Sequence, residues 1–548
     1  MSASRMRWWG WGVDGHDGPL PGRGAALLRA ELSPGRPPAA RRPPVALDQV
    51  VLPEPELSAP ARAALVAAVG AEHVLDDHPT RVLHAAGRSY PDLVRLRTGA
   101  LEVAPDAVVA PAGRAEVAVV LEACAEHGVA VVPFGGGTSV VGGVDAVRGG
   151  HHAAIALDLR RLDHVDLDAR SLLATFGAGT LGPAAERALA ARGLTLGHHP
   201  QSFEFSTVGG WVATRSAGQA STGYGRIDAL VRGVRLTAPA GEVVAPPFPA
   251  TAAGPDLRQL VVGSEGTLGV ITEATLRVRP APAARHHEAW ALPGFAAGSE
   301  ALRALAQAGA APAVTRLSDE EETRFNLAMA GRAGQALSGY ARARGQRRPC
   351  LLICGHEGTE DGVRAGRRAA ARILRRHGAV ALGPAPGRAW AQGRFHGPYL
   401  RDELMTQGLL VDTLETAATW SGLLEAYRGA GAALRRTLAA RGTPALVGCH
   451  ISHVYPTGAS LYFTYLARAE PGAELEQWRA AKAAASDALV AAGATITHHH
   501  AVGRDHAPWL GAEVGELGLE LLRAARARLD PDGIMNPGKL VMPPVNVA

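Results

Sequence analysis

The chain has three consecutive glycines within Pro133-Phe134-Gly135-Gly136-Gly137-Thr138-Ser139, and its fold can be inferred outward from this loop. An apolar run at 129–133 predicts a strand leading into it, and apolar residues spaced along one helical face at 117–124 predict a helix before that strand. Three consecutive glycines are entropically costly to order, so they need a reason. Their bare N–H groups suit an anion nest for a pyrophosphate. A tight turn without a ligand is the alternative.

Two further loops of this kind follow at 201–217 and 263–272, and both combine glycines with hydroxyl side chains. Three such loops in one part of the chain favour a common ligand-binding face over three unrelated turns. A competing motif at 177–182 (GAGTLG) matches the dinucleotide fingerprint G-x-G-x-x-G. No strand ending in an acidic residue follows about 20 residues later, which weighs against a Rossmann domain.

The bulk properties are those of a globular protein with two or more domains. The chain has 548 residues, of which 47% are apolar and 20% charged. The net charge of +5 is too small to indicate nucleic-acid binding. Four cysteines suggest reduced thiols and a cytoplasmic location. No apolar run is long enough to cross a membrane, while peripheral membrane contact stays open.

The pattern of elements predicts a mixed α+β protein. Strands are expected near 107–111, 153–159, 172–178, 229–237 and 268–279, with a helix near 183–192. A domain boundary is expected near 281–300. Beyond it, helices are expected near 299–309, 360–377, 419–441 and 475–492, and strands near 349–355, 445–454 and 460–466.

Several motifs resemble a known family. The loop at 133–139, the segment GSEGTLGVIT at 263–272 and NPGK at 536–539 resemble FAD-linked oxidases of the vanillyl-alcohol oxidase type. Within that superfamily, RWWGWG at 7–12, EFSTVGGW at 204–211 and LETAATW at 414–420 are most similar to the alkyldihydroxyacetonephosphate synthases. Other supporting segments are YGRID at 224–228, TRLSD at 315–319 and HHH at 498–500.

The resemblance implies a two-part FAD-binding domain of the PCMH type, an α/β cap domain for the substrate, and a helical C-terminal segment. The implied boundaries are 1–103 (N-terminal, partly irregular and helical), 104–280 (FAD-binding), 281–500 (cap) and 501–548 (returning to the FAD domain). The FAD is expected to be bound non-covalently, because no Cys or His lies within 133–139, although attachment through His151 or His152 stays open. The implied FAD contacts are Pro133, Phe134, Gly135, Gly136, Gly137, Thr138, Ser139, Gln201, Ser202, Phe203, Glu204, Phe205, Ser206, Thr207, Thr214, Arg215, Ser216, Ala217, Glu265, Gly266, Thr267, Leu268, Gly269, Val270 and Ile271.

The resemblance also implies the reacting side chains. Arg401 corresponds to a residue that holds the substrate phosphate, and Tyr462 to an acid/base residue. The other implied catalytic residues are Arg316, His198, His498, His499 and His500.

The residue types fit these roles on physical grounds. The planar fork of arginine suits a phosphate or a carboxylate, although a salt bridge of Arg401 with Asp402 or Glu403 is the structural alternative. Strand alternation places Tyr462 and Thr464 on one face. A tyrosine needs nearby positive charge to act as a base at neutral pH, and the histidine run is expected to supply it. No third or fourth ligand is apparent near the run in the sequence, so no metal is expected.

Two activities follow from the resemblance. The first is the exchange of an acyl group on dihydroxyacetone phosphate for a fatty alcohol, as in ether-lipid synthesis. The alternative is an FAD-linked dehydrogenase or oxidase of a small 2-hydroxy acid such as D-lactate or glycolate. The expected partner is a small-molecule or lipid-phosphate substrate, and a homodimer stays open.

Overall fold

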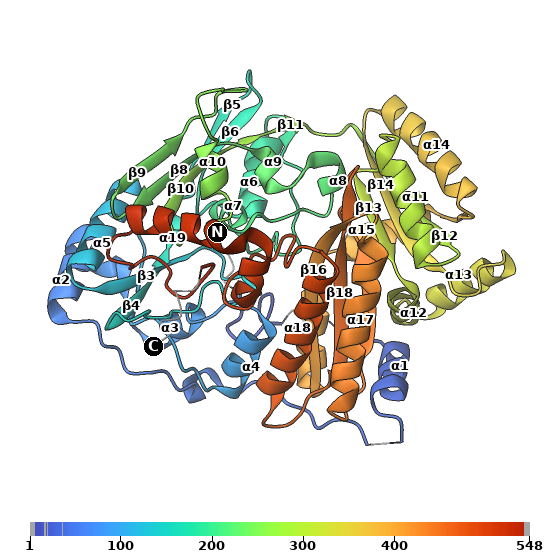
Figure 1. Ribbon diagram of the computed structural model, residues 1–548, viewed down its shortest axis with the longest axis horizontal. Coiled ribbons are helices and arrows are strands. Elements are labelled where there is room, and N and C mark those ends of the chain that lie inside the picture. Colours follow the sequence, from blue (N-terminus) through green and yellow to red (C-terminus); the bar gives the residue numbers. More distant parts are fainter. Residues whose placement is uncertain (1–5, 16–17, 19, 36, 542–548) are drawn as a thin grey trace.

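A computed structural model describes residues 6–15, 18, 20–35 and 37–541. The sequence segments 1–103 and 501–548 therefore each include residues outside the described ranges. Figure 1 shows two sheets and their helices on one side of the molecule, and a large third sheet with its helices on the other. The red C-terminal helix lies across the first side, among elements from the first half of the chain.

The first sheet carries the triple-glycine loop at the end of a buried strand. Its strands in spatial order are β1 (Val74–Leu75), β2 (Ala107–Val109), β4 (Ala153–Asp158) and β3 (Val129–Phe134). β4 runs parallel to both β2 and β3. The sheet is covered by α2 (Ala59–Val69) and α5 (Arg114–Glu126), whose apolar faces share one core with it. The predicted strand–helix–strand unit is confirmed.

The second sheet is antiparallel throughout. Its strands in spatial order are β5 (Val165–Asp168), β6 (Leu173–Gly177), β10 (Val270–Arg277), β8 (Val231–Ala238) and β9 (Gly241–Ala245). The motif at 177–182 leaves β6 and enters α6 (Gly182–Ala190), but both neighbours of β6 are antiparallel to it. A Rossmann unit needs parallel strands, so that alternative is excluded here. A Cβ at Gly179 would lie 1.9 Å from the oxygen of Leu159, so packing requires this glycine.

The third sheet has seven antiparallel strands. In spatial order they are β15 (Val380–Gly383), β12 (Ala284–Leu292), β14 (Cys350–Gly358), β13 (Val314–Ser318), β17 (Leu446–Ile451), β18 (Gly458–Arg468) and β16 (Leu409–Thr419). Four helices share its main apolar core: α11 (Phe295–Gln307), α14 (Glu360–Arg376), α17 (Leu423–Ala440) and α18 (Glu474–Ala491). These helices agree with the predicted ones. The strands β12, β13, β15 and β16 were not predicted.

Shorter helices connect and cover the three sheets. Around the first two sheets they are α3 (His78–Leu83), α7 (Val208–Thr214), α9 (Ile227–Leu230) and α10 (Leu257–Val261). Two helices from this part of the chain contact the third sheet: α4 (Tyr90–Thr98) packs against β16 and α18, and α8 (Ser221–Tyr224) against β13. Around the third they are α1 (Gly22–Leu32), α12 (Glu320–Met329), α13 (Gly331–Ala343), α15 (Pro384–Gly393) and α16 (Gly397–Thr406). Two short strands, β7 (Leu194–Thr195) and β11 (Arg279–Pro280), pair with each other.

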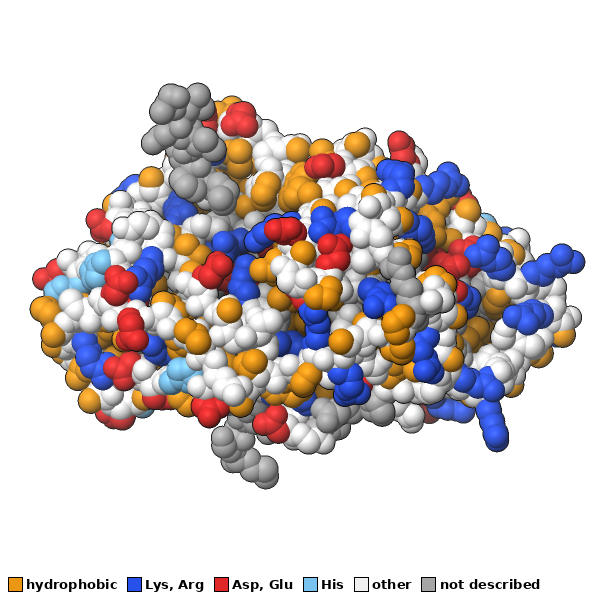
Figure 2. Space-filling view, turned by 90° about the horizontal axis from the view of Figure 1, so that it is seen from below, with side chains coloured by type: hydrophobic (Ala, Val, Ile, Leu, Met, Phe, Trp, Pro, Cys, Tyr) orange, Lys and Arg blue, Asp and Glu red, His pale blue; other side chains and the backbone are white. Residues whose placement is uncertain are grey.

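The end of the described chain packs against the first sheet. After α19 (Leu510–Leu529), Met535 bridges to Val131, and the Asn536 side chain donates to the backbone oxygens of Gly143 and Glu265. The surface seen in Figure 2 has acidic and basic side chains interspersed, in keeping with the small net charge. None of the helices in the described part of the chain has the length and apolar character of a bilayer span.

Candidate active site

A cavity of about 510 Å³ is lined by residues of the glycine loops and of the third sheet. The loops contribute residues from 133–139, 201–217 and 265–271, and the sheet contributes side chains of β13, β16, β17 and β18. The cavity thus joins the two halves of the molecule. Its polar groups gather around Tyr462, while Phe325, Leu400, Leu404, Val411, Leu446 and Leu466 form an apolar wall.

The triple-glycine loop is a backbone cradle in which side chains do not fit. A Cβ on Gly135 would lie 2.4 Å from Thr207 Oγ1, and one on Gly136 would lie 1.8 Å from the oxygen of Phe205. Gly137 has φ +65°, which favours glycine. The glycines therefore allow this loop to pack closely against the second loop while its residues line the cavity. This geometry fits a diphosphate.

The second and third loops are held by buried polar contacts. Thr207 caps α7 by accepting from the N–H of Gly210 at 3.3 Å. Glu265, with φ +53°, accepts from the N–H groups of Val502 and Gly503 at 2.8 and 2.7 Å. Burial raises the pKa of Glu265 to about 7 despite these bonds. This carboxyl joins the third loop to the segment that follows the histidine run.

Most of the expected FAD contacts line the cavity, and some lie behind it. Phe203, Glu204, Phe205, Arg215, Thr267, Leu268 and Val270 are absent from the lining. Arg215 instead donates to the backbone oxygens of Val262 and Gln259, and so braces the second loop. These seven residues shape the loops rather than face the cavity.

Arg401 lines the cavity from α16, and two of its guanidinium nitrogens are available to a ligand. Its Nη1 donates to the backbone oxygen of Arg88 at 2.8 Å, whereas its Nε and Nη2 are buried without a hydrogen-bond partner. The nearest carboxylate oxygen, on Asp402, lies 3.8 Å from Nε. The ion pair with Asp402 is therefore loose. Buried, unpaired guanidinium N–H groups are costly unless an anionic ligand accepts from them.

Tyr462 lines the cavity on β18, on the same face as Thr464, as strand alternation predicts. Its hydroxyl donates to Thr413 Oγ1 at 3.1 Å, and its ring stacks on His450 with centroids 4.7 Å apart. Burial raises the pKa of Tyr462 to about 12, so the phenol is protonated at neutral pH. It is thus placed to donate a proton or to pass one on.

The expectation that the histidine cluster supplies positive charge to Tyr462 is not met by the buried members of the cluster. Burial lowers the pKa values of His450, His453 and His498, which are therefore neutral near pH 7. The same holds for His500. The permanent positive charge near Tyr462 is that of Arg316, which sequence reasoning had assigned to the site without this role.

Arg316 is anchored by two buried residues that sequence reasoning missed. Its Nη1 lies 2.9 Å from His450 Nε2, and its Nη2 donates to Glu322 Oε1 at 2.8 Å. Glu322 also contacts His450 Nδ1 at 3.0 Å. Burial opposes ionisation of Glu322, but His450 and Arg316 outweigh it and lower its pKa to about 2. The glutamate is therefore a fixed negative charge that orients Arg316 at the cavity wall.

The histidine run is fixed by another buried carboxylate, Glu415 of β16. It accepts from the backbone N–H groups of His498, His499 and His500 at 2.7, 3.1 and 2.9 Å. It also accepts from the hydroxyl of Thr497 at 2.6 Å. Of the three histidines, His499 and His500 line the cavity and His498 lies behind them. One carboxylate thus sets the conformation of the whole run.

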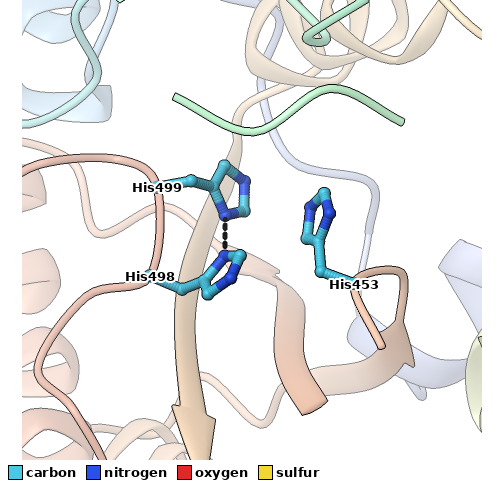
Figure 3. Close-up of side chains that lie close together, drawn as sticks. All are labelled: His453, His498 and His499. Carbon is cyan, nitrogen blue, oxygen red and sulfur yellow. Dashed lines mark hydrogen bonds between the residues drawn. The ribbon is translucent and has the colours of Figure 1, made fainter. Parts of the chain in front are cut away.

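His453 joins this run from a distant part of the chain. Figure 3 shows it facing His498 and His499. The possible ligand atoms of the three residues all lie within 4.8 Å of one another. The sequence showed no third ligand because His453 lies about 45 residues earlier, just beyond the end of β17. The tertiary fold brings His453 to His498 and His499, and their separation along the chain does not reveal this contact.

His198 does not line the cavity. It is fully buried, with Nε2 2.8 Å from Ser216 Oγ and its ring 4.9 Å from that of Trp211. Burial lowers its pKa to about 3, so it is a neutral partner of Ser216, which does line the cavity. Trp11 and Trp390, which sequence reasoning did not assign, do line the cavity. Trp11 belongs to the RWWGWG motif, so the family resemblance of that motif could have identified it as a site residue.

Two domain families match the chain. The FAD binding domain matches residues 105–245, and the C-terminal domain of FAD linked oxidases matches residues 281–540. Among proteins of known name, the chain is 33% identical to the alkyldihydroxyacetonephosphate synthase of Dictyostelium discoideum, over 86% of this chain and 79% of the relative. It is 32% identical to that of Trypanosoma brucei brucei, over 90% and 82%. A solved alkyldihydroxyacetonephosphate synthase structure superimposes with a TM-score of 0.85 at 29% identity, covering 98% and 99% of the two chains.

Proposed function

The chain belongs to the alkyldihydroxyacetonephosphate synthase family of FAD-linked oxidases, and from this premise we propose how its site performs the family reaction. FAD is the cofactor, and the enzyme is a transferase of ether-lipid synthesis. It exchanges the acyl group on dihydroxyacetone phosphate for a fatty alcohol. The cradle at 133–139 would hold the diphosphate of a non-covalently bound FAD, and the bound flavin would supply covalent catalysis without net redox change.

The observation that carries the substrate assignment is Arg401. Its Nε and Nη2 are buried without a partner beside a cavity that also has an apolar wall. A phosphate accepts from such a fork by two parallel bonds. A long alkyl or acyl chain suits the wall of Phe325, Leu404 and Val411, because burying a methylene group yields about 0.8 kcal/mol. Phosphate and chain together describe a lipid phosphate.

Proton movement falls to the cluster on the third sheet. Tyr462 is protonated at neutral pH and lines the cavity, so it donates to or relays from the reacting oxygen. Arg316 orients the substrate or stabilises developing negative charge, since Glu322 and His450 fix its fork. His499 and His500 line the same cavity, where their ring nitrogens are placed to form hydrogen bonds with the substrate.

The dehydrogenase alternative has less support. A small 2-hydroxy acid offers a carboxylate to Arg401 but leaves the apolar wall without an occupant. The relatives that share a third of their residues with this chain are synthases.

Product analysis tests the proposal. The FAD-loaded protein is incubated with acyl dihydroxyacetone phosphate and a long-chain alcohol, and the products are identified by mass spectrometry. We expect the alkyl ether and one free fatty acid per ether formed. Absence of the ether, together with flavin bleaching by D-lactate or glycolate, would favour the dehydrogenase instead. Arg401→Met serves as the variant that abolishes phosphate recognition, and Arg372→Met on α14, outside the cavity, is its matched control.

A further inference from the structure

A hydrogen-bonded chain leads from the cavity into the protein. His499, which lines the cavity, has Nδ1 3.0 Å from His498 Nδ1. The other nitrogen of His498, Nε2, lies 2.7 Å from the hydroxyl of Tyr455. Neither His498 nor Tyr455 lines the cavity. These three residues are called the histidine relay below, and Figure 3 shows the bond between its two imidazoles.

The outer end of the histidine relay lies close to the surface. Tyr455 is half-buried, and its neighbour Arg226 forms an ion pair with the partly exposed Asp228. Arg226 also donates to the backbone oxygen of His498 at 2.7 Å, which holds this part of the relay in place. The chain of bonds therefore connects a buried reaction site with a region that water reaches.

The proposed exchange produces a proton that must leave the cavity. The alcohol O–H bond breaks and its oxygen bonds to the glycerone carbon that carried the acyloxy group. The bond between that carbon and the ester oxygen breaks, and the acyloxy group leaves as a carboxylate with the electron pair of that bond. A carboxylic acid has a pKa near 4, so at neutral pH one proton remains for each turnover. No oxidant or reductant is consumed in this balance.

We propose that the histidine relay carries this proton from the cavity to solvent, an inference that rests on the proposed function. His499 takes the proton on Nε2 and releases the one on Nδ1 to His498 Nδ1. His498 then releases its Nε2 proton to the oxygen of Tyr455, whose hydroxyl proton passes to water. Each group gains one proton as it loses another, so no imidazolium accumulates in the interior.

The surroundings of the relay favour this direction. A carboxylate oxygen of Glu415 lies 3.4 Å from His499 Nδ1, which stabilises the tautomer that carries its proton there. That tautomer leaves Nε2 free to accept from the cavity. His453 stacks on His498 with centroids 4.9 Å apart and is itself held by Ser221 Oγ. The ring of His498 is therefore fixed with one nitrogen toward each neighbour.

A metal ion bound by His453, His498 and His499 is the competing use of the same nitrogens. It would occupy His498 Nδ1 and His499 and interrupt the relay. Two features favour the relay. The Nδ1 atoms of His498 and His499 already face each other at hydrogen-bond distance. His453 Nδ1 and His498 Nε2 are each hydrogen-bonded to a hydroxyl group, that of Ser221 and that of Tyr455.

Tyr455→Phe tests the relay by removing its last proton acceptor. In the FAD-loaded enzyme we expect kcat to fall about 100-fold, the lower end of what a positioned proton-transfer group contributes, with KM and the flavin spectrum unchanged. The solvent deuterium isotope effect on kcat should exceed that of the wild type, since proton transfer becomes slower. Tyr224→Phe is the matched control, because it removes a hydroxyl that donates to Glu357 at 2.7 Å away from the cavity.

Each other outcome counts against the relay. Wild-type kcat in Tyr455→Phe, or a loss of kcat with an unchanged isotope effect, overturns it while leaving the proposed function intact. A wild-type enzyme that forms no ether overturns the proposed function and the relay together. One tightly bound metal ion per chain, with activity lost on chelation and restored by zinc, overturns the relay in favour of the metal site.

Discussion

Replacing Glu415 by glutamine should release the histidine run from its anchor. In the wild type, Oε1 accepts from Thr497 and from the N–H groups of His499 and His500, and Oε2 accepts from the N–H of His498. The amide oxygen of glutamine can replace Oε1, but its NH₂ group then faces the N–H of His498, to which it cannot act as an acceptor. One buried N–H is then unpaired, which costs about 1–3 kcal/mol. Glu415→Ala leaves four donors unpaired and should cost about 4 kcal/mol or more.

Urea unfolding monitored by flavin fluorescence and circular dichroism measures this loss, and steady-state kinetics measures its effect on the site.

Burial opposes ionisation of Glu415, but His499 and its hydrogen bonds lower the pKa of this carboxyl well below 4.5. The stabilisation is therefore fully present above pH 4.5 and is lost as the pH falls through the lowered value. Glu242→Gln, in an exposed pair with Arg235, is the control and should change stability by less than about 0.5 kcal/mol. Equal stability and kcat in Glu415→Gln and wild type would show that this carboxylate does not anchor the histidine run.

Three further outcomes are expected. Arg401→Lys should raise KM for the lipid phosphate about 10-fold to 100-fold with a smaller change in kcat, because one charged hydrogen bond is worth about 1.5–3 kcal/mol. An unchanged KM in steady-state assays would contradict phosphate binding at this residue. Gly136→Ala should yield protein without visible flavin absorbance, since its Cβ would meet the Phe205 oxygen at 1.8 Å, whereas Gly22→Ala, with open space around it, should retain the flavin. Burial raises the pKa of Glu265 from 4.5 to about 7, so its contribution to stability is present below pH 4.5 and is lost as the pH rises through 7. Glu265→Gln should remove about 3 kcal/mol of this change in the free energy of unfolding with pH. If denaturant titrations give the same dependence of stability on pH in both proteins, Glu265 does not contribute it.

The sequence was most informative where function constrains the backbone. The strand at 129–134 and the glycine loop after it follow from local rules, since apolar runs and glycine clusters are read directly. The same holds for the alternation that places Tyr462 and Thr464 together. The antiparallel order of the cap strands was not predictable in this way. β16 in particular was missed, because its residues are buried on both faces and show no simple period.

The partners of the reacting side chains were also beyond sequence reasoning. His450 lies directly across from Tyr462 in the pairing of β17 with β18, and Glu415 lies across from Tyr462 in the pairing of β16 with β18. A one-residue change of register would turn either side chain to the opposite face. Register is set by the packing of the whole sheet, so a single sequence does not reveal these neighbours. His198, which the resemblance implied as a site residue, lies outside any strand, and its burial against Ser216 and Trp211 is a tertiary contact that the sequence pattern does not reveal.

The contact between Trp11 and α16 has a consequence for how this enzyme is made. Trp11 lines the cavity, and its backbone N–H donates to Asp402, 391 residues further along the chain. At a synthesis rate of about 5–20 residues per second, Trp11 waits roughly 20–80 s for that partner to leave the ribosome. Earlier partners are available meanwhile, because Arg88 donates to the backbone oxygens of Arg7 and Gly10, and the ring of Phe205 contacts that of Trp11 edge-on. The N-terminal part of the cavity is thus made first, and the cavity is complete only after Tyr462, His499 and His500 have also been synthesised.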